Sequence, residues 1–230
     1  MRPSAARPVA RAAHPAHGAG AMTHDLIAEL RRARVVPVVR TNSTEHALSA
    51  VEWLREAGFR VFEITMTVPD SLSLMRRLAS EPGTLVGAGT VPDVGAARAC
   101  LDAGARFIVT PWVDPAVIAA TREAGALPLP GTVTPTEIRA AVAAGAEGVK
   151  IFPAASVGGP GHVKALRSVF PGVPFCPTGG VDPSNAPAYF EAGADFVGMG
   201  GKLVDEKRIA AGDKAAILRA ARDALGLMQA

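Results

Sequence analysis

Lys150 is the residue whose type and position most clearly suggest chemistry. It interrupts an apolar stretch, GVKIFP, that has the short, buried character of a parallel strand. The chain has five lysines against nineteen arginines, and the other four lysines fall in helical or loop contexts. Burial favours an uncharged amine, which can attack a carbonyl, whereas arginine cannot. The position predicts either a nucleophile or a buried ion pair with Glu63.

Glu63 is a second charge inside a predicted strand, VFEIT. Strand alternation puts Val61, Glu63 and Thr65 on one face, and we expect Glu63 and Lys150 to project toward the same interior. A carboxylate beside an amine can hold or shuttle a proton. The alternative is a carboxylate that only balances the charge of Lys150 or Arg40.

Two glycine pairs indicate an anion site. Gly179-Gly180 follows the seventh predicted strand and Gly200-Gly201 follows the eighth. In (β/α)8 enzymes these two loops often bind phosphate through backbone N–H groups and a helix N-terminus. Tight turns are the alternative interpretation.

The secondary-structure elements that must position these residues are predicted from a repeated helix–strand sequence pattern. Its helices end at glycines spaced 46, 21, 20 and 48 residues apart, which predicts αβ units of about 22–24 residues. The eight predicted strands are Val35–Arg40, Arg60–Thr65, Thr84–Gly87, Arg106–Thr110, Leu127–Leu129, Gly148–Phe152, Val173–Pro177 and Asp195–Met199. The helices are expected to begin at Ser43 or Thr44, Asp70, Asp93, Asp114, Thr134 and Asp182.

Eight such units predict an α/β protein with a single (β/α)8 TIM barrel and an N-terminal helix. An open, doubly wound sheet is the rival architecture, and the even repetition argues against it. We expect one domain over residues 22–230. Residues 1–21 lack an apolar run and are expected to be a disordered tail, with translation from Met22 as a second possibility.

Charge and cysteine usage argue against several classes of protein function. Without Arg2, Arg7 and Arg11 the remaining 21 basic residues balance 21 acidic ones, which leaves no basic surface for nucleic acid. Residues 1–21 lack the long apolar stretch of a transmembrane helix, and we expect no membrane partner. Cys100 and Cys176 form no CxxC pair, and a reduced cytoplasmic protein is the simplest interpretation. The histidines are scattered, so we expect no metal site.

At these residues the sequence resembles the 2-keto-3-deoxy-6-phosphogluconate (KDPG) aldolase family, also described as 4-hydroxy-2-oxoglutarate (KHG) aldolase, a class I, Schiff-base family. The resemblance runs in order from about Asp25 to Val204. It is carried by VVPVVR at Val35–Arg40, FEITMTVPD at Phe62–Asp70, GAGTV at Gly87–Val91, IVTP at Ile108–Pro111, LPG at Leu129–Gly131, KIFPA at Lys150–Ala154 and CPTGGV at Cys176–Val181.

The resemblance implies a role for each matching residue. Lys150 would form the Schiff base, Glu63 would be the general acid and base, and Thr90 would hold the substrate carboxylate. The implied pocket and phosphate residues are Arg40, Pro111, Phe152, Thr178, Gly179, Gly180 and Gly200. The resemblance further implies a homotrimer that needs no cofactor or metal, with pyruvate and a phosphorylated keto-deoxy sugar acid as its small-molecule partners.

Two positions depart from the family pattern. Thr67 stands where many members have an arginine, so we expect a different carboxylate clamp at that position. Gly201 stands where a serine often donates to the phosphate, which leaves backbone donors and puts strict selectivity for phosphorylated substrates in question.

The reaction implied is cleavage of KDPG to pyruvate and glyceraldehyde 3-phosphate. The first alternative is the same chemistry on 4-hydroxy-2-oxoglutarate or on the galactonate epimer. An epimerase or thiamin-phosphate synthase is a second, although such enzymes commonly need metal ligands that the sequence lacks. A non-catalytic phosphosugar-binding barrel is the third.

Overall fold

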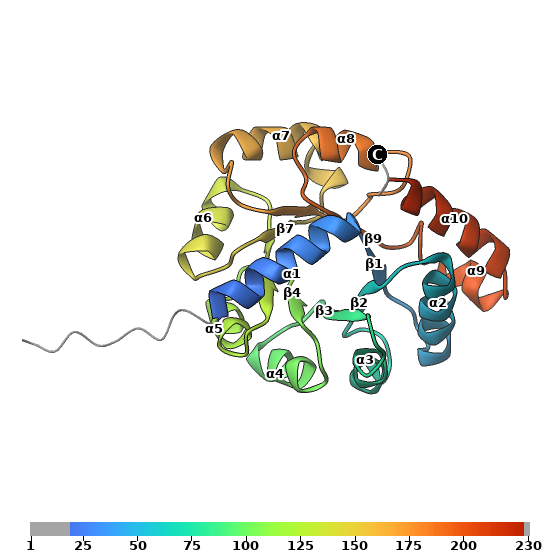
Figure 1. Cartoon of the computed structure of the whole chain (residues 1–230). Helices are drawn as coiled ribbons and strands as arrows, with labels where there is room; N and C mark the ends of the chain where they lie inside the picture. Colours follow the sequence, from blue (N-terminus) through green and yellow to red (C-terminus); the bar gives the residue numbers. More distant parts are fainter. Residues whose placement is uncertain (1–18, 228–230) are drawn as a thin grey trace, which may run out of the picture.

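The computed structural model describes residues 19–227, over which strands and helices alternate along the chain (Figure 1). The strands are β1 Val35–Val39, β2 Val61–Thr65, β3 Leu85–Gly89, β4 Phe107–Val109, β5 Leu127–Leu129, β6 Gly131–Thr132, β7 Val149–Ile151, β8 Phe175–Pro177 and β9 Val197–Met199. The helices are α1 Ala19–Ala33, α2 Thr44–Ala57, α3 Ser71–Ala79, α4 Val94–Asp102, α5 Pro115–Glu123, α6 Pro135–Ala143, η1 Ala155–Val157, α7 Gly159–Val169, α8 Ala186–Glu191, α9 Glu206–Ala210 and α10 Lys214–Gly226.

The strands form one closed parallel barrel. A six-stranded sheet runs in the order β5-β4-β3-β2-β1-β9, and a three-stranded sheet runs β6-β7-β8. A parallel bridge between Thr178 and Gly198 joins β8 to β9 at one seam. At the other seam Pro130 lies between β5, which matches the fifth predicted strand, and the short β6, and its carbonyl accepts from the Lys150 N–H at 2.9 Å. The predicted (β/α)8 barrel is confirmed, and an open sheet is excluded.

Alternation along the strands separates two cores. Phe62, Ile64, Val149 and Ile151 belong to the outer core, where the strands meet the surrounding helices. The inner core lies within the barrel and is formed by side chains of the opposite strand faces together with α1. Its buried members are Leu26, Ile27, Leu30, Val36, Val61, Leu85, Phe107, Val109, Leu127, Leu129, Cys176 and Phe196.

Helix α1 lies across one end of the barrel, as its blue ribbon shows in Figure 1. Leu26, Ile27 and Leu30 insert into the inner core, which starts at the amino ends of the strands. The expected tail falls mostly on residues 1–18, which lie outside the described residues, whereas residues 19–21 belong to α1. No helix within residues 19–227 is long and apolar enough to cross a membrane.

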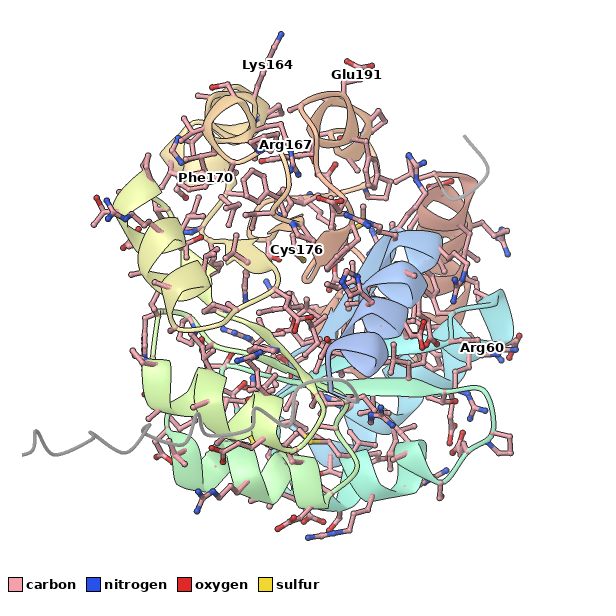
Figure 2. All side chains as sticks on the ribbon, turned by 60° about the vertical axis from the view of Figure 1, so that its left-hand side comes forward. Arg60, Lys164, Arg167, Phe170, Cys176 and Glu191 are labelled. Atoms are coloured by element: carbon pink, nitrogen blue, oxygen red, sulfur yellow. The ribbon has the colours of Figure 1, made fainter. Side chains whose placement is uncertain are left out.

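Asp195 ties the amino end of the barrel together. Its carboxylate pairs with Arg31 of α1 at 2.7 Å and with Arg167 of α7 at 2.7 Å. Figure 2 shows Arg167 turned inward from α7, while Lys164 and Glu191 point away from the barrel. This cluster holds α1 and α7 on the start of β9. The opposite, carboxyl end of the barrel carries the polar residues identified from the sequence.

Local capping explains where most helices begin. The side chains of Ser43, Asp93, Asp114 and Thr134 accept hydrogen bonds from the first turns of α2, α4, α5 and α6, as predicted. Asp70 is the N-cap residue of α3, as predicted, but a cap bond from its side chain was a wrong expectation. It precedes α3 in a left-handed conformation (φ 52°) and makes no side-chain cap bond.

The predicted cap at Asp182 was also wrong, because α8 begins later in the chain. Its N-cap residue is Asn185, and Asp182 instead accepts from the backbone N–H groups of Ser184 and Asn185. Its carboxylate therefore stabilises the turn before α8.

Replacing Leu30 by Ala should destabilise the fold by about 3 kcal/mol, because this fully buried side chain fills the amino end of the barrel. Val142→Ala is the control, since Val142 is 42% exposed and its truncation should change the unfolding free energy by about 0.5 kcal/mol or less. Urea unfolding followed by circular dichroism measures both. Equal losses for the two variants would contradict a structural role for α1 in the inner core.

Candidate active site

Strand β7 presents Lys150 to the barrel interior. Its neighbours Val149 and Ile151 lie in the outer core, so alternation turns Lys150 inward, where it is 5% exposed. The carbonyl of Lys150 accepts from the Thr132 hydroxyl at 3.2 Å. The side-chain nitrogen Nζ lies 4.7 Å from the centre of the Phe152 ring. The side chain is thus held within the barrel at the carboxyl end of the strand.

Glu63 faces Lys150 from β2. The carboxylate is also buried, and its Oε1 lies 4.0 Å from Lys150 Nζ. This separation is too long for a direct hydrogen bond. Oε1 has no hydrogen-bond partner among the described residues, although a buried polar atom without a partner is unfavourable. A group placed between the amine and the carboxylate can contact both, which suits proton transfer during a reaction.

Glycines of β3 make room for the Glu63 side chain. An ideal Cβ atom built on Gly89 would overlap Glu63 Oε1, and one on Gly87 would overlap the Phe107 ring. Glu63 and Gly87 are register partners in adjacent parallel strands. Glycine is therefore required at position 89, because the Glu63 carboxylate occupies the space that a side chain there would fill.

A cavity of about 540 Å³ opens above Lys150 at the carboxyl ends of β1, β7, β8 and β9. Eight of the predicted site residues line it, namely Arg40, Lys150, Phe152, Thr178, Gly179, Gly180, Gly200 and Gly201. The sequence analysis missed Val38, Val181, Lys202 and Asp205, which also line it. Lys202 directly follows the second glycine pair, so its place was available from chain order alone.

Four other predicted residues do not line this cavity. Glu63 lies beneath it beside Lys150. Thr90 follows β3 with a positive φ of 56° and accepts from Arg40 Nη2 at 2.8 Å, so it reaches the cavity through Arg40. Thr67 is exposed, with its hydroxyl 2.8 Å from that of Thr65. Pro111 is half-buried after β4.

Glu206 fixes the loop that carries Arg40. The Glu206 carboxylate accepts from the Asn42 backbone N–H at 2.5 Å and from its side-chain amide at 3.1 Å. His46 Nδ1 lies 3.7 Å from the same carboxylate. The β1–α2 loop is thereby held against α9. No sequence pattern indicated this contact, because 164 residues separate Asn42 from Glu206.

The loop after β8 is shaped by its glycines. Gly179 and Gly180 have φ values of 93° and 77°, a left-handed region that favours glycine. Gly179 O accepts from Ala155 N at 3.0 Å, which joins the loop to η1. The helices that follow the two glycine loops, α8 and α9, are short, with six and five residues. The loop N–H groups and nearby side chains are what an anion would meet.

Cys176 lies opposite Lys150 in the register of β8 and β7. Burial raises the pKa of the Cys176 thiol to about 12, well above its ordinary value. The neutral thiol therefore adds no charge to the layer shared by Lys150 and Glu63. Within residues 19–227 no group of three or more His, Cys, Asp or Glu side chains could hold a metal ion.

Comparison with known proteins identifies the family. Residues 26–220 match the protein family described as "Aldolase: KDPG and KHG aldolase". The chain belongs to the KDPG and KHG aldolase family. The resemblance inferred from the motifs is thus confirmed, and membership assigns the chain to the aldolases, which are lyases.

Individual members of the KDPG and KHG aldolase family agree with this assignment. A Rhizobium meliloti (strain 1021) protein named "Probable 2-dehydro-3-deoxy-6-phosphogalactonate aldolase" is 39% identical over 172 residues, 74% of this chain and 81% of that protein. The KHG/KDPG aldolase of Escherichia coli (strain K12) is 34% identical over 193 residues, 83% and 90% of the two chains. The KDPG aldolase of Legionella pneumophila, crystallised with pyruvate captured as a covalent carbinolamine, has a TM-score of 0.78 at 31% identity and covers 85% of this chain and 96% of that one.

Gly89→Ala should lower aldol-cleavage activity by about 100-fold or more, because the added methyl group displaces the Glu63 carboxylate that is the candidate general acid and base. Gly161→Ala is the matched control, since nothing lies within 4 Å of the point where its added methyl group would stand on α7. Steady-state kcat is the measurement, with circular dichroism to verify folding. Normal kcat in folded Gly89→Ala protein would contradict the role assigned to this close packing.

Proposed function

We propose that the chain is a class I aldolase that cleaves KDPG to pyruvate and glyceraldehyde 3-phosphate through a Schiff base on Lys150. The observation that carries the proposal is the buried pair of Lys150 Nζ and Glu63 Oε1, 4.0 Å apart beneath an open cavity. Membership of the KDPG and KHG aldolase family supports the same assignment.

The first half of the reaction forms the electron sink. The unprotonated Lys150 amine adds to the C2 ketone of the substrate, and the resulting carbinolamine takes up one proton from solvent and loses water to give a protonated imine. Glu63, acting directly or through a water, takes the proton of the C4 hydroxyl. The C3–C4 bond then breaks, its electron pair moves into the iminium, and glyceraldehyde 3-phosphate leaves.

The second half regenerates the enzyme. Glu63 returns a proton to the enamine carbon that was C3, which forms the imine of pyruvate. Water adds to this imine and pyruvate departs, so Lys150 is a free amine again. Protons balance because the carboxylate takes one proton from the C4 hydroxyl and returns one to C3, and the proton taken up when the imine forms is released when it is hydrolysed.

The lining of the cavity suits an anionic substrate. We assign Arg40 and Thr90, joined by their 2.8 Å hydrogen bond, to the substrate carboxylate. Thr67, exposed after β2, is the further candidate for that end. Phe152, Pro111 and Thr178 would flank the carbon chain, and the N–H groups of the four glycines would meet the phosphate.

The same chemistry on 4-hydroxy-2-oxoglutarate or on the galactonate epimer is the second candidate. It is favoured by Thr67 and Gly201, which replace an arginine and a serine of the family pattern. The Rhizobium relative carries the galactonate name. Retro-aldol kcat/KM values on the three substrates decide between them. A non-catalytic binding protein would not need a buried amine beside a carboxylate oxygen that lacks a partner among the described residues.

We further propose that the protein works as a homotrimer in the cytoplasm, where Cys100 and Cys176 stay reduced. Trp112 supports an intersubunit contact, because it follows β4 and is 52% exposed. Light scattering should give three times the chain mass of 23.6 kDa. Trp112→Glu should lower the measured mass. A wild-type protein of single-chain mass would contradict the trimer.

Borohydride reduction in the presence of pyruvate tests the Schiff base. We expect irreversible inactivation that requires both reagents, and one modified peptide, containing Lys150, in the mass spectrum. Lys150→Met should show no labelling. Glu63→Gln should still be labelled while its kcat falls by about 10²–10⁴-fold, because it keeps the nucleophile and loses the proton carrier. Labelling at Lys164 or Lys202, or no labelling, would overturn the mechanism.

A further inference from the structure

Lys202 is a cation at the cavity to which neither the family motifs nor the aldol chemistry assigns a role. It follows β9 directly after Gly200 and Gly201 and lines the same cavity as Lys150. Its side chain is exposed, and it makes no hydrogen bond or ion pair with any residue in the described part of the chain. The charge is therefore directed at solvent and at whatever enters the cavity.

Asp205, the acidic residue that lines the cavity, is already engaged. Its Oδ1 accepts from the backbone N–H groups of Lys207 and Arg208 at 3.0 and 3.2 Å, which caps α9. Its Oδ2 lies 3.5 Å from Arg208 Nε. Because both oxygens have partners, Asp205 leaves the charge of Lys202 largely uncompensated.

Asp182, which lines a neighbouring hollow together with Lys202, is also engaged. Its carboxylate accepts from the Ser184 hydroxyl at 2.5 Å and from the Ser184 and Asn185 N–H groups at 2.9 and 3.3 Å. These bonds, led by that of the Ser184 hydroxyl, hold the pKa of Asp182 below its ordinary value, and the charge of Lys202 adds a smaller lowering. The hydrogen bonds, rather than Lys202, satisfy this carboxylate.

The other groups at this end of the cavity are neutral. The glycine pairs after β8 and β9 offer only N–H groups, and the Thr178 hydroxyl is 3.4 Å from the Cys176 carbonyl. Arg40, the other exposed cation of the lining, is hydrogen-bonded to Thr90. Neutral donors discriminate between a phosphate dianion and a hydroxyl group less strongly than an ammonium group does. The reason is that charge-assisted hydrogen bonds are about twice as strong as neutral ones.

We propose that Lys202 is the specificity-determining residue of this cavity and that its ammonium group pairs with the terminal phosphate of the substrate. The pairing selects phosphate monoesters over substrates with an uncharged terminus, and it replaces the donor that Gly201 lacks. The assignment rests on the proposed function for the substrate, although the anion site itself can be tested without catalysis.

Binding of glycerol 3-phosphate, which cannot form a Schiff base, tests the anion site. Phosphorus NMR titration of the full chain should show Lys202→Met binding about tenfold more weakly than wild type, with Lys202→Arg close to wild type. Lys207→Met is the matched control, since Lys207 is exposed on α9 and does not line the cavity. The wild-type affinity should fall with added salt more steeply than that of Lys202→Met. No binding by wild type, or equal binding by Lys202→Met, would overturn the proposal.

Kinetics on KDPG and on unphosphorylated 2-keto-3-deoxygluconate test the selectivity. Lys202→Met should lose about tenfold in kcat/KM on KDPG, mainly through KM, and about twofold or less on the unphosphorylated acid. Equal losses on both substrates would overturn the proposal. Borohydride trapping with pyruvate separates the two claims. If wild type is not trapped but binds glycerol 3-phosphate through Lys202, the aldolase mechanism fails and the anion site stands.

Discussion

The closed parallel barrel is the constraint on which the site depends. Closure turns alternate residues of every strand into one shared interior, where a charged residue on β2 can meet one on β7. Glu63 and Lys150 do so at 4.0 Å, close enough to act on one molecule and too far apart to satisfy each other. Apolar inner-core residues and α1 fill the space below, which leaves access only from the carboxyl ends of the strands.

Around this pair, the cavity is lined both by charged side chains and by backbone N–H groups of glycine loops. Arg40 is held by Thr90, and its loop is held by Glu206, which gives the β1 side of the cavity a positioned cation. The loops after β8 and β9 carry the glycine pairs and the ammonium group of Lys202, which pairs with no residue in the described part of the chain. Cys176, opposite Lys150, stays a neutral thiol because burial raises its pKa to about 12. The arrangement suits a substrate with an anionic group at each end.

What the sequence could predict was local or periodic. Alternation placed Lys150 and Glu63 on inward faces, and short-range capping located Ser43 and Thr134. The fifth strand was predicted with its observed bounds, but the two-residue strand β6 beyond Pro130 was missed, because Pro130 lacks the N–H that would continue the ladder from β5. The Asn42–Glu206 contact depends on loops that meet only after the barrel closes, so no local pattern predicts it. Lys202 directly follows the second glycine pair, so its place at the cavity could have been inferred from chain order.

The central claim is that Lys150, in the interior of the barrel, is the amine that bonds to the keto acid. A crystal structure of the protein soaked with pyruvate tests it most directly. We predict continuous electron density from Lys150 Nζ to C2 of pyruvate, with the Glu63 carboxylate as the acidic group nearest to the pyruvate methyl carbon. Pyruvate bound without a covalent link to Lys150, or joined to another lysine, would contradict the account.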